Sequence, residues 1–288
     1  MSAVAALLPD GRLHLQHGPI DCLCRAWGEP PEIAAAYDQA ARFFATVLEN
    51  LCAELSTLRA PLPTLPPAGR IARAMHAACM PYKEAFITPM AAVAGAVADA
   101  VLAAMVEGRD VTRAFVNNGG DISFHLSPGT SLRCGLVADI SKMASLDGTF
   151  LLTATHPTRG VATSGRACKG RGGKSFSFGI ADAVTALARS AAQADAAATI
   201  IGNAVDIAGH PAIDRRAASD IDPAGDLGDR LVTFKVGPLS DNDVELALDA
   251  GEATAKTLLR RGLIEGAVLS LRCRLRTCHT TLALMEPA

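Results

Sequence analysis

Two side chains near the middle of the chain have types and a spacing that suit a cation. Asp195 and Thr199 lie four positions apart in the stretch Gln-Ala-Asp-Ala-Ala-Ala-Thr, residues 193–199. On a helix, this spacing places both side chains on one face. A carboxylate and a hydroxyl so placed could hold a hard cation, typically Mg²⁺ bound with waters and a substrate phosphate. The alternative is structural, because the helix dipole favours an Asp near a helix N-terminus and the Thr is tolerated there.

A pair of glycines between two strand-like runs is the second candidate. Residues 115–122 read Phe-Val-Asn-Asn-Gly-Gly-Asp-Ile. Because Gly119 and Gly120 have no side chains, their backbone N–H groups can approach a ligand closely. Asn118 and Asp121 flank them, and Asp121 adds an acceptor at the edge. The alternative is a β-hairpin turn, since Asn-Gly and Gly-Asp are hairpin residues by themselves.

The third candidate is a turn of small residues, Gly-Val-Ala-Thr-Ser-Gly-Arg, at residues 160–166. Thr163, Ser164 and Gly165 supply hydroxyl and backbone groups that suit ligand binding. The stretch is not the G-x-S-x-G motif of a nucleophilic serine, and no helical pattern follows it. A plain turn at the end of a strand is the alternative.

Gly173, Lys174 and Ser175 invite comparison with a phosphate-binding loop. The first glycine of G-x-x-x-x-G-K-S would fall where this chain has Cys168. The residues that follow predict a strand, and not the helix whose N-terminus would hold the phosphate. The sequence therefore predicts a basic turn here.

The hydrophobic pattern predicts the elements that must position these candidates: a block of helices, a run of strands, then helices again. This order is typical of an α+β protein with a largely antiparallel sheet packed with helices. We expect one domain over residues 1–288, with a strand pair and helices in 1–110 and the motif-bearing part in 111–288. The expected helices cover residues 32–58, 68–78, 89–107, 191–207 and 241–261, and the expected strands cover 12–17, 20–25, 113–116, 122–126, 131–138, 149–154, 160–162, 175–186, 231–236 and 266–275, with a polar, Asp-rich loop before residue 231.

Composition excludes several classes of protein. The 288 residues are 50% hydrophobic and 19% charged, and 27 Lys and Arg against 29 Asp and Glu give a net charge of −2. No block of like charge is present, which argues against a nucleic-acid partner. The most apolar window, residues 91–106, carries Asp99 and is rich in Ala, so we expect a buried helix and no membrane span. The eight cysteines form no C-x-x-C pair and the first residues lack a secretory pattern, so we expect reduced, mostly buried thiols and a cytoplasmic protein.

Four short motifs, taken together in their order along the chain, show a resemblance that none of them shows alone. Val-Asn-Asn-Gly-Gly-Asp-Ile, Gly-Val-Ala-Thr-Ser-Gly-Arg, Ala-Asp-Ala-Val-Thr and Gln-Ala-Asp-Ala-Ala-Ala-Thr follow one another along the chain. In this order they resemble the ApbE superfamily, the FAD:protein FMN transferases, over about residues 85–208. Residues 86–95 and the stretches at 225–233 and 245–251 look closer to one branch of it, the uncharacterised protein family 0280. The resemblance implies an ApbE-like α+β fold.

The resemblance also assigns roles to the candidates. It makes residues 118–121 and 163–165 contacts to FAD or a related flavin nucleotide. It makes Asp195 and Thr199 the ligands of Mg²⁺, which would serve pyrophosphate chemistry. The expected partner is a small-molecule ligand, with neither nucleic acid nor a membrane. A homo-oligomer and the identity of any acceptor protein are left open.

Three elements of the family pattern are missing from this chain, and the first is its N-terminal Met-Gly-Thr segment. Residues 88–95 stand in the place of its Lys-Gly loop and contain no lysine. Ser-Phe-Gly-Ile-Ala-Asp, residues 177–182, stands in the place of a His-x-x-Asp-Pro segment that supplies a catalytic acid or base. Asp182 could replace that carboxylate. Two functions follow: a Mg²⁺-dependent enzyme, either a flavin transferase or an FAD pyrophosphatase, or a non-catalytic module that binds a flavin or another small molecule in a cofactor or redox pathway.

Overall fold

The computed structural model describes residues 2–136, 148–166 and 176–279. The chain forms two compact units. Unit 1 comprises Met1–Leu132, Leu151–Ala162 and Leu187–Ala196, and unit 2 comprises Arg133–Phe150, Thr163–Ala186 and Ala197–Ala288. The single domain expected for residues 1–288 stays a prediction. The predicted basic turn of Gly173, Lys174 and Ser175, with Cys168, lies outside the described residues.

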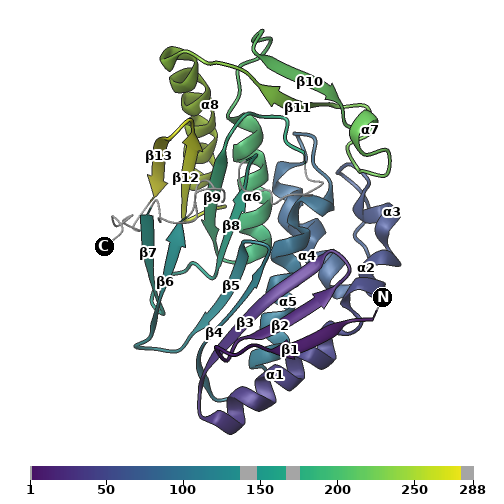
Figure 1. The fold of residues 1–288 in the computed structure, drawn as a ribbon, viewed down its shortest axis with the longest axis vertical. Coiled ribbons are helices and arrows are strands. Elements are labelled where there is room, and N and C mark those ends of the chain that lie inside the picture. Colours follow the sequence, from purple (N-terminus) through teal and green to yellow (C-terminus); the bar gives the residue numbers. More distant parts are fainter. Residues whose placement is uncertain (1, 137–147, 167–175, 280–288) are drawn as a thin grey trace. The chain divides into compact units, whose positions relative to one another are not determined.

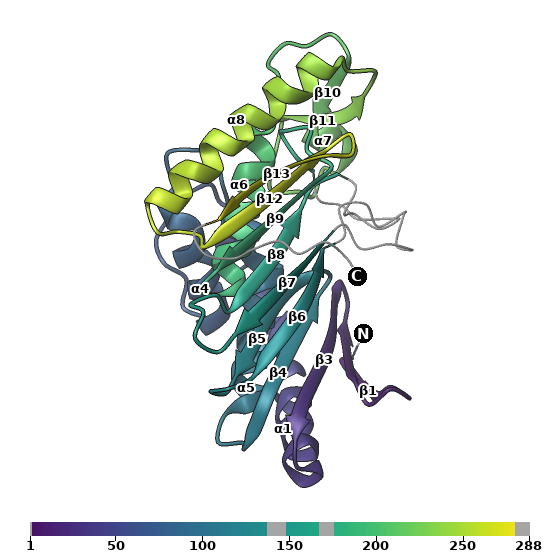
Figure 2. The ribbon, with the colours of Figure 1, turned by 90° about the vertical axis from the view of Figure 1, so that its left-hand side faces the viewer.

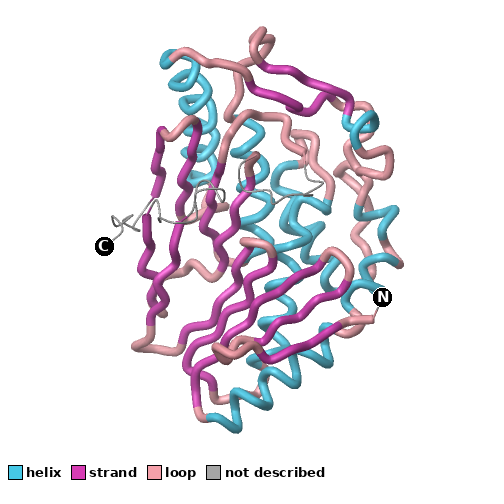
Figure 3. The backbone as a smooth tube through the Cα atoms, in the orientation of Figure 1, coloured by secondary structure: helices cyan, strands magenta, loops and turns pink. Residues whose placement is uncertain are grey.

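Unit 1 contains an antiparallel meander, drawn in magenta in Figure 3. Its strands alternate between buried and more exposed residues, and in β3 the buried set includes Ile20, Cys22 and Cys24. This alternation is expected of a sheet with one face against the core. The first two residues of β8 add a further strand beside β5, because Val161 pairs with Ile122 and Gly160 pairs with Ser123. The strands are β1 (Val4–Leu7), β2 (Leu13–His17), β3 (Ile20–Gly28), β4 (Val111–Asn118), β5 (Asp121–Leu126) and β8 (Gly160–Ser164).

The helix predicted over residues 32–58 is wrong as one element, because the structure has three helices there. Thr46 and Glu54 leave helical geometry, with φ/ψ of −111°/2° and −115°/17°. At the second break, the Glu54 carboxylate accepts from the N–H groups of Ala68 and Gly69, directly before the helix that begins at Arg70, at 2.6 and 2.7 Å. The helices of this region are α1 (Pro30–Phe44), α2 (Val47–Cys52), α3 (Leu55–Leu58), α4 (Arg70–Cys79), η1 (Met80–Tyr82), η2 (Pro89–Ala92) and α5 (Val93–Val106).

The most apolar segment of the chain forms the core helix of unit 1. Residues 89–106 are long and apolar enough to cross a membrane by length and composition. In the structure, α5 packs against β4, β5 and α1 (Figures 1 and 2). Small residues such as Ala96, Ala98 and Val97 are fully or almost fully buried in this packing.

Unit 2 combines strands with two longer helices. In it, β8, β9 and β12 follow one another in the strand order, and β12 pairs with β13 in an antiparallel hairpin. α8 packs along this hairpin (Figure 2), and its N-terminus carries a capping box of Ser240 and Asp243. The elements are β6 (Ser131–Leu136), β7 (Gly148–Thr153), β9 (Ala183–Ala188), α6 (Ala191–Ala204), β10 (Ile213–Ala217), α7 (Ala218–Ile221), β11 (Leu231–Val236), α8 (Asp241–Arg260), β12 (Gly266–Leu271) and β13 (Arg274–His279), some of which the boundaries between units divide.

Two sequence expectations for this region are corrected. The polar loop expected before residue 231 contains β10, which pairs with β11. The last strand, expected over residues 266–275, is the β12–β13 hairpin. Its two-residue turn consists of Arg272 and Cys273 at φ 50° and 63°, a left-handed conformation in which Gly or Asn is usual. Because neither Arg272 nor Cys273 is a typical turn residue, the hydrophobic pattern predicted one uninterrupted strand across this turn.

The fold class expected from the sequence is confirmed. Helices and antiparallel strand pairs are mixed along the chain, as Figure 3 shows. Of the cysteines in the described part of the chain, all are free and four are buried: Cys22, Cys24, Cys79 and Cys278. This is an α+β protein.

Candidate functional site

The Gly-Gly-Asp stretch forms the tight turn between β4 and β5. Asn118 pairs with Asp121 across the ladder, so Gly119 and Gly120 alone make the turn. Both have positive φ, 63° and 110°, and the Gly120 N–H donates to Asn117 Oδ1 at 2.8 Å. The hairpin interpretation is therefore confirmed. Nothing described lies within 4 Å of a Cβ built on either glycine, so the turn is also open to a ligand. Its ligand contacts stay a prediction.

Asp195 lies near the start of α6 and binds the start of α5. Its Oδ2 accepts from the Gly95 N–H at 3.1 Å, and the Ala94 N–H also donates to this carboxylate. Asn118 reaches the same segment, because its Nδ2 donates to the Ala94 carbonyl oxygen at 3.1 Å. Residues 94–95 belong to the stretch that replaces the family's Lys-Gly loop. The structure thus joins this stretch to the Gly-Gly turn and to Asp195.

Asp121 brings a second carboxyl group to Asp195. The Asp121 side chain lies close enough to that of Asp195 to raise the pKa of Asp195 through a side-chain hydrogen bond. Burial raises the pKa of Asp195 well above its ordinary value, and the neighbouring charge of Asp121 raises it further. Two carboxyl groups held this close favour either a shared proton or a cation that neutralises both.

Asp99, the charged residue within apolar α5, fixes the elements that carry this pair. Its Oδ1 accepts from Ser123 Oγ on β5 at 2.6 Å and from the Ala191 N–H at 3.0 Å, and its Oδ2 accepts from the Ala192 N–H at 2.9 Å. It therefore caps the N-terminus of α6 from another helix. Burial raises the pKa of Asp99, and these hydrogen bonds oppose that rise.

The donor chemistry of the carboxyl pair fits a hard cation. Mg²⁺ takes carboxylate oxygens and keeps several waters or phosphate oxygens in an octahedral shell. No group of three or more His, Cys, Asp or Glu side chains suited to a metal occurs in the described ranges 2–136, 148–166 and 176–279. A cation at Asp121 and Asp195 would thus need ligands from water or a substrate. Thr199 follows Asp195 by one helical turn in α6, as the spacing predicted.

The Thr-Ser-Gly turn ends β8 within unit 2. Thr163 Oγ1 lies 2.8 Å from Thr185 Oγ1 on β9, so this hydroxyl is engaged within the sheet. Gly165 has φ 149°, and a Cβ there would lie 2.3 Å from the Asp182 carbonyl oxygen. Only glycine fits this close approach of two backbones. Ser164 is half-buried. The ligand contacts of residues 163–165 stay a prediction.

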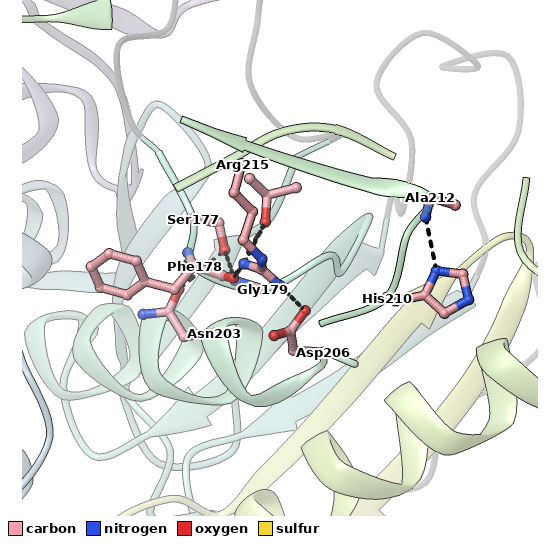
Figure 4. A network of polar contacts seen from close by, with 9 residues as sticks. Ser177, Phe178, Gly179, Asn203, Asp206, His210, Ala212 and Arg215 are labelled. Atoms are coloured by element: carbon pink, nitrogen blue, oxygen red, sulfur yellow. Dashed lines mark hydrogen bonds and ion pairs between the residues drawn. The ribbon is translucent and has the colours of Figure 1, made fainter. Parts of the chain in front are cut away.

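A polar network holds the segment that replaces His-x-x-Asp-Pro (Figure 4). Asn203 Oδ1 accepts from Ser177 Oγ at 3.1 Å and from the Phe178 N–H at 3.0 Å. Arg215 donates to the Phe178 carbonyl oxygen and forms an ion pair of 2.5 Å with Asp206. The end of α6 and strand β10 therefore fix this segment, although it lacks the family's histidine.

Asp182 ends that segment and binds the turn of the β12–β13 hairpin. Its Oδ2 accepts from the Arg272 N–H at 2.6 Å, and its own N–H donates to the Ser270 carbonyl oxygen at 2.9 Å. The carboxylate thus stabilises a left-handed turn formed without glycine. A catalytic role for Asp182 stays a prediction.

Sequence reasoning missed Asp99 and Gly95 as parts of the site. The signal for Asp99 was present, because a lone carboxylate in an Ala-rich helix needs buried donors. Gly95 gave no local signal. A Cβ on it would lie 2.2 Å from the Ala191 carbonyl oxygen, a contact that depends on which helices meet.

Comparison with known proteins finds a matching family model and several similar proteins. The family model described as "AbpE bacteria" matches residues 5–277. A UPF0280 protein of Methanothrix thermoacetophila is 39% identical over 148 residues, which cover 50% of this chain and 55% of that protein. A UPF0280 protein of Methanococcus vannielii is 42% identical over 123 residues, 42% of this chain and 47% of that protein. The chain spans about half the length of the curated relatives it matches.

Among solved structures, the flavin transferase ApbE from Vibrio cholerae aligns at 12% identity and a TM-score of 0.40. The alignment covers 97% of this chain and 98% of that one. The match over residues 5–277 and the UPF0280 relatives confirm the superfamily and the branch expected from the motifs.

Proposed function

Since the chain belongs to the AbpE bacteria family, we propose that it binds a flavin nucleotide, FAD or a close relative, together with Mg²⁺ held at Asp121 and Asp195. The observation that carries the proposal is the carboxyl pair itself. The pair lies where the Gly-Gly turn and the start of α6 meet within unit 1.

The metal part of the proposal rests on charge. Two carboxyl groups this close repel each other when both are ionised, and the charge of Asp121 raises the pKa of Asp195 accordingly. A divalent cation would supply the opposite charge that the pair needs, and a role for Thr199 as a further ligand stays a prediction. Mg²⁺ bound there would polarise a pyrophosphate group. The chain's own contribution is to hold the two carboxylates, through Asp99 and the N–H groups of residues 94–95, before the ligand arrives.

The flavin part rests on the family and on the turns. The open backbone at Gly119 and Gly120 suits close approach by a nucleotide. The family pattern also assigns flavin contacts to the hydroxyl and backbone groups of residues 163–165, and this assignment stays a prediction.

The metal site is tested by substitution of each carboxylate. We expect Asp195→Asn and Asp121→Asn to weaken Mg²⁺-dependent stabilisation and Mg²⁺-dependent FAD binding by about tenfold or more. Without Mg²⁺, their melting temperatures should stay near wild type, because the change relieves a costly carboxyl pair. Asp249→Asn, at an exposed position of α8, is the matched control. A large loss of stability with an unchanged metal response would support the helix-dipole alternative instead.

The flavin site is tested by titration with FAD, FMN and ADP. Binding is measured as quenching of fluorescence and as the heat released in calorimetry. Saturable binding of at least one of the three supports the proposal. No signal with any of them at high micromolar concentration contradicts it. The absorbance spectrum of a small molecule that co-purifies with the protein would identify the ligand directly.

One observation favours the non-catalytic module over the enzyme. Asp182, the carboxylate that could replace the missing His-x-x-Asp-Pro acid, accepts the Arg272 N–H at 2.6 Å. A carboxylate held in a structural hydrogen bond is less available to take the proton of an acceptor hydroxyl. This second function keeps the flavin and the metal but omits the transfer step.

A further inference from the structure

The single tryptophan of the chain, Trp27, lies on the face of the meander opposite to its helices. Ala26 in β3 and Ala114 in β4 are buried on the side against which α1 and α5 pack. Because successive residues of a strand point to opposite faces, Trp27 and its cross-strand partner Arg113 lie on the other side. Both side chains are half-buried.

Two arginines and a second aromatic ring surround the indole. The guanidinium carbons of Arg25 and Arg113 lie 5.1 and 4.6 Å from the centroid of the Trp27 ring. The Phe115 ring, directly across the ladder from Arg25, lies 5.9 Å from the same ring at an interplanar angle of 51°. We call these four residues the Trp27 cluster. Trp, Phe and Arg are enriched at the centres of protein–protein interfaces.

A β-bulge fixes the backbone beneath the Trp27 cluster. Trp27 pairs with Arg113, but the next residue, Gly28, pairs with Val111, so Thr112 is the extra residue on β4. The Thr112 hydroxyl donates to the Trp27 carbonyl oxygen at 3.1 Å. Bulges commonly re-aim a neighbouring side chain, and here the bulge holds the indole before any partner binds.

The Trp27 cluster carries two positive charges that no carboxylate within the described ranges pairs with. Arg25 contacts the indole ring, and Arg113 donates to the neutral Ser131 carbonyl oxygen at 3.2 Å. Asp10, a carboxylate on which the charge of Arg25 acts, is itself paired with Arg12 at 2.7 Å. A guanidinium binds a carboxylate through two parallel hydrogen bonds, so the cluster is complementary to acidic groups.

We propose that the Trp27 cluster is a docking surface for an acidic segment of a partner protein. Carboxylates of that segment accept from Arg25 and Arg113, while an apolar side chain packs against the rings of Trp27 and Phe115. Charge argues against a second copy of this chain as the occupant. A two-fold axis through this face would place the two arginines of one copy against those of the other.

The docking surface is separate from the carboxyl pair of the proposed function. Asp121 and Ser123 share one face of β5, and Ser123 donates to Asp99 of α5 at 2.6 Å. The Trp27 cluster lies on the opposite face of the meander. Its occupancy therefore does not depend on a flavin nucleotide or on Mg²⁺.

Intrinsic fluorescence tests the proposal directly, because Trp27 is the only tryptophan. The probe is a synthetic peptide of alternating Glu and Leu, and two matched peptides carry Gln or Lys in place of Glu. We expect the Glu peptide to change the emission saturably, and this binding to weaken as salt is added. The Gln peptide should bind about tenfold more weakly or less, and the Lys peptide should give no signal.

Substitutions assign the binding to the cluster. Arg25→Gln and Arg113→Gln should each weaken binding of the Glu peptide about tenfold, with melting temperatures near wild type. Trp27→Phe should also weaken it, measured by the anisotropy of a labelled peptide. Arg42→Gln, at an exposed ion pair with Asp38, is the control and should bind like wild type.

Several results would overturn the proposal. These are no binding of the Glu peptide, equal binding of the Glu and Gln peptides, or binding that Arg25→Gln leaves unchanged. In sedimentation velocity, a dimer that Trp27→Ala dissociates would assign the face to a second copy instead. A single-stranded oligonucleotide that binds more tightly than the Glu peptide would assign it to nucleic acid. None of these outcomes depends on the metal response of Asp121 and Asp195.

Discussion

The N–H of Gly95 donates to Asp195 Oδ2 at 3.1 Å, across a sequence separation of 100 residues. The contact joins the start of α5 to the start of α6. It exists only because position 95 has no side chain, since a Cβ there would lie 2.2 Å from the Ala191 carbonyl oxygen and 2.7 Å from the Ala192 nitrogen. One glycine therefore decides how closely the two helices approach and whether Asp195 receives its backbone donors.

Gly95→Ala should destabilise the protein by about 1–3 kcal/mol or more, because the new methyl group meets backbone that cannot rotate away. The free energy of unfolding from urea titration measures this loss. Gly202→Ala is the matched control, since it also lies within a helix but its Cβ would meet only side-chain atoms at 3.9 and 4.0 Å. The control should be neutral or up to about 1 kcal/mol more stable through helix propensity. Equal effects of the two substitutions would contradict the close approach of α5 and α6.

Asp99→Asn should remove part of the pH dependence of stability. Burial raises the pKa of Asp99 in the folded protein, so the folded state holds this proton more tightly than the unfolded chain does. Its contribution to stability is therefore complete below the unfolded pKa, roughly 3.9, and is lost as the pH rises through the raised folded pKa.

The difference in unfolding free energy between wild type and Asp99→Asn measures this effect. It should decrease as the pH rises from about 4 and become constant above the folded pKa. Ser123→Ala serves as the control, because it removes the donor to Asp99 Oδ1 but leaves the titrating group. A difference that stays constant across the whole range would contradict a raised pKa at Asp99.

The protein should not transfer FMN to an acceptor protein at a rate typical of the superfamily. General-base help is worth about 10²- to 10⁴-fold, and the candidate base in the segment that replaces His-x-x-Asp-Pro, Asp182, accepts the Arg272 N–H at 2.6 Å. Incubation with FAD, Mg²⁺ and a standard flavinylation acceptor, followed by mass spectrometry, checks for an adduct of FMN mass. Robust adduct formation that disappears in Asp182→Asn but persists in Asp249→Asn would make Asp182 the catalytic base.

The sequence by itself determined the turns, strands and helices that depend on interactions between residues near one another in the chain. Gly119 and Gly120 make a two-residue turn because both need positive φ, and the flanking strands follow from alternation. Helix periodicity placed Asp195 and Thr199 in α6. The order of the motifs along the chain identified the superfamily. Each motif can be read from local sequence because it lies at a turn or at the start of a helix.

Tertiary structure alone decided what these elements bring together. The pairing of Asp121 with Asp195, and the capping of α6 by Asp99, depend on packing between segments about 70 to 90 residues apart, which local propensity does not encode. The Arg272–Cys273 turn shows the same limit. Neither residue favours left-handed backbone, and the turn forms because Asp182 binds the Arg272 N–H there, with the strands of the hairpin paired on either side.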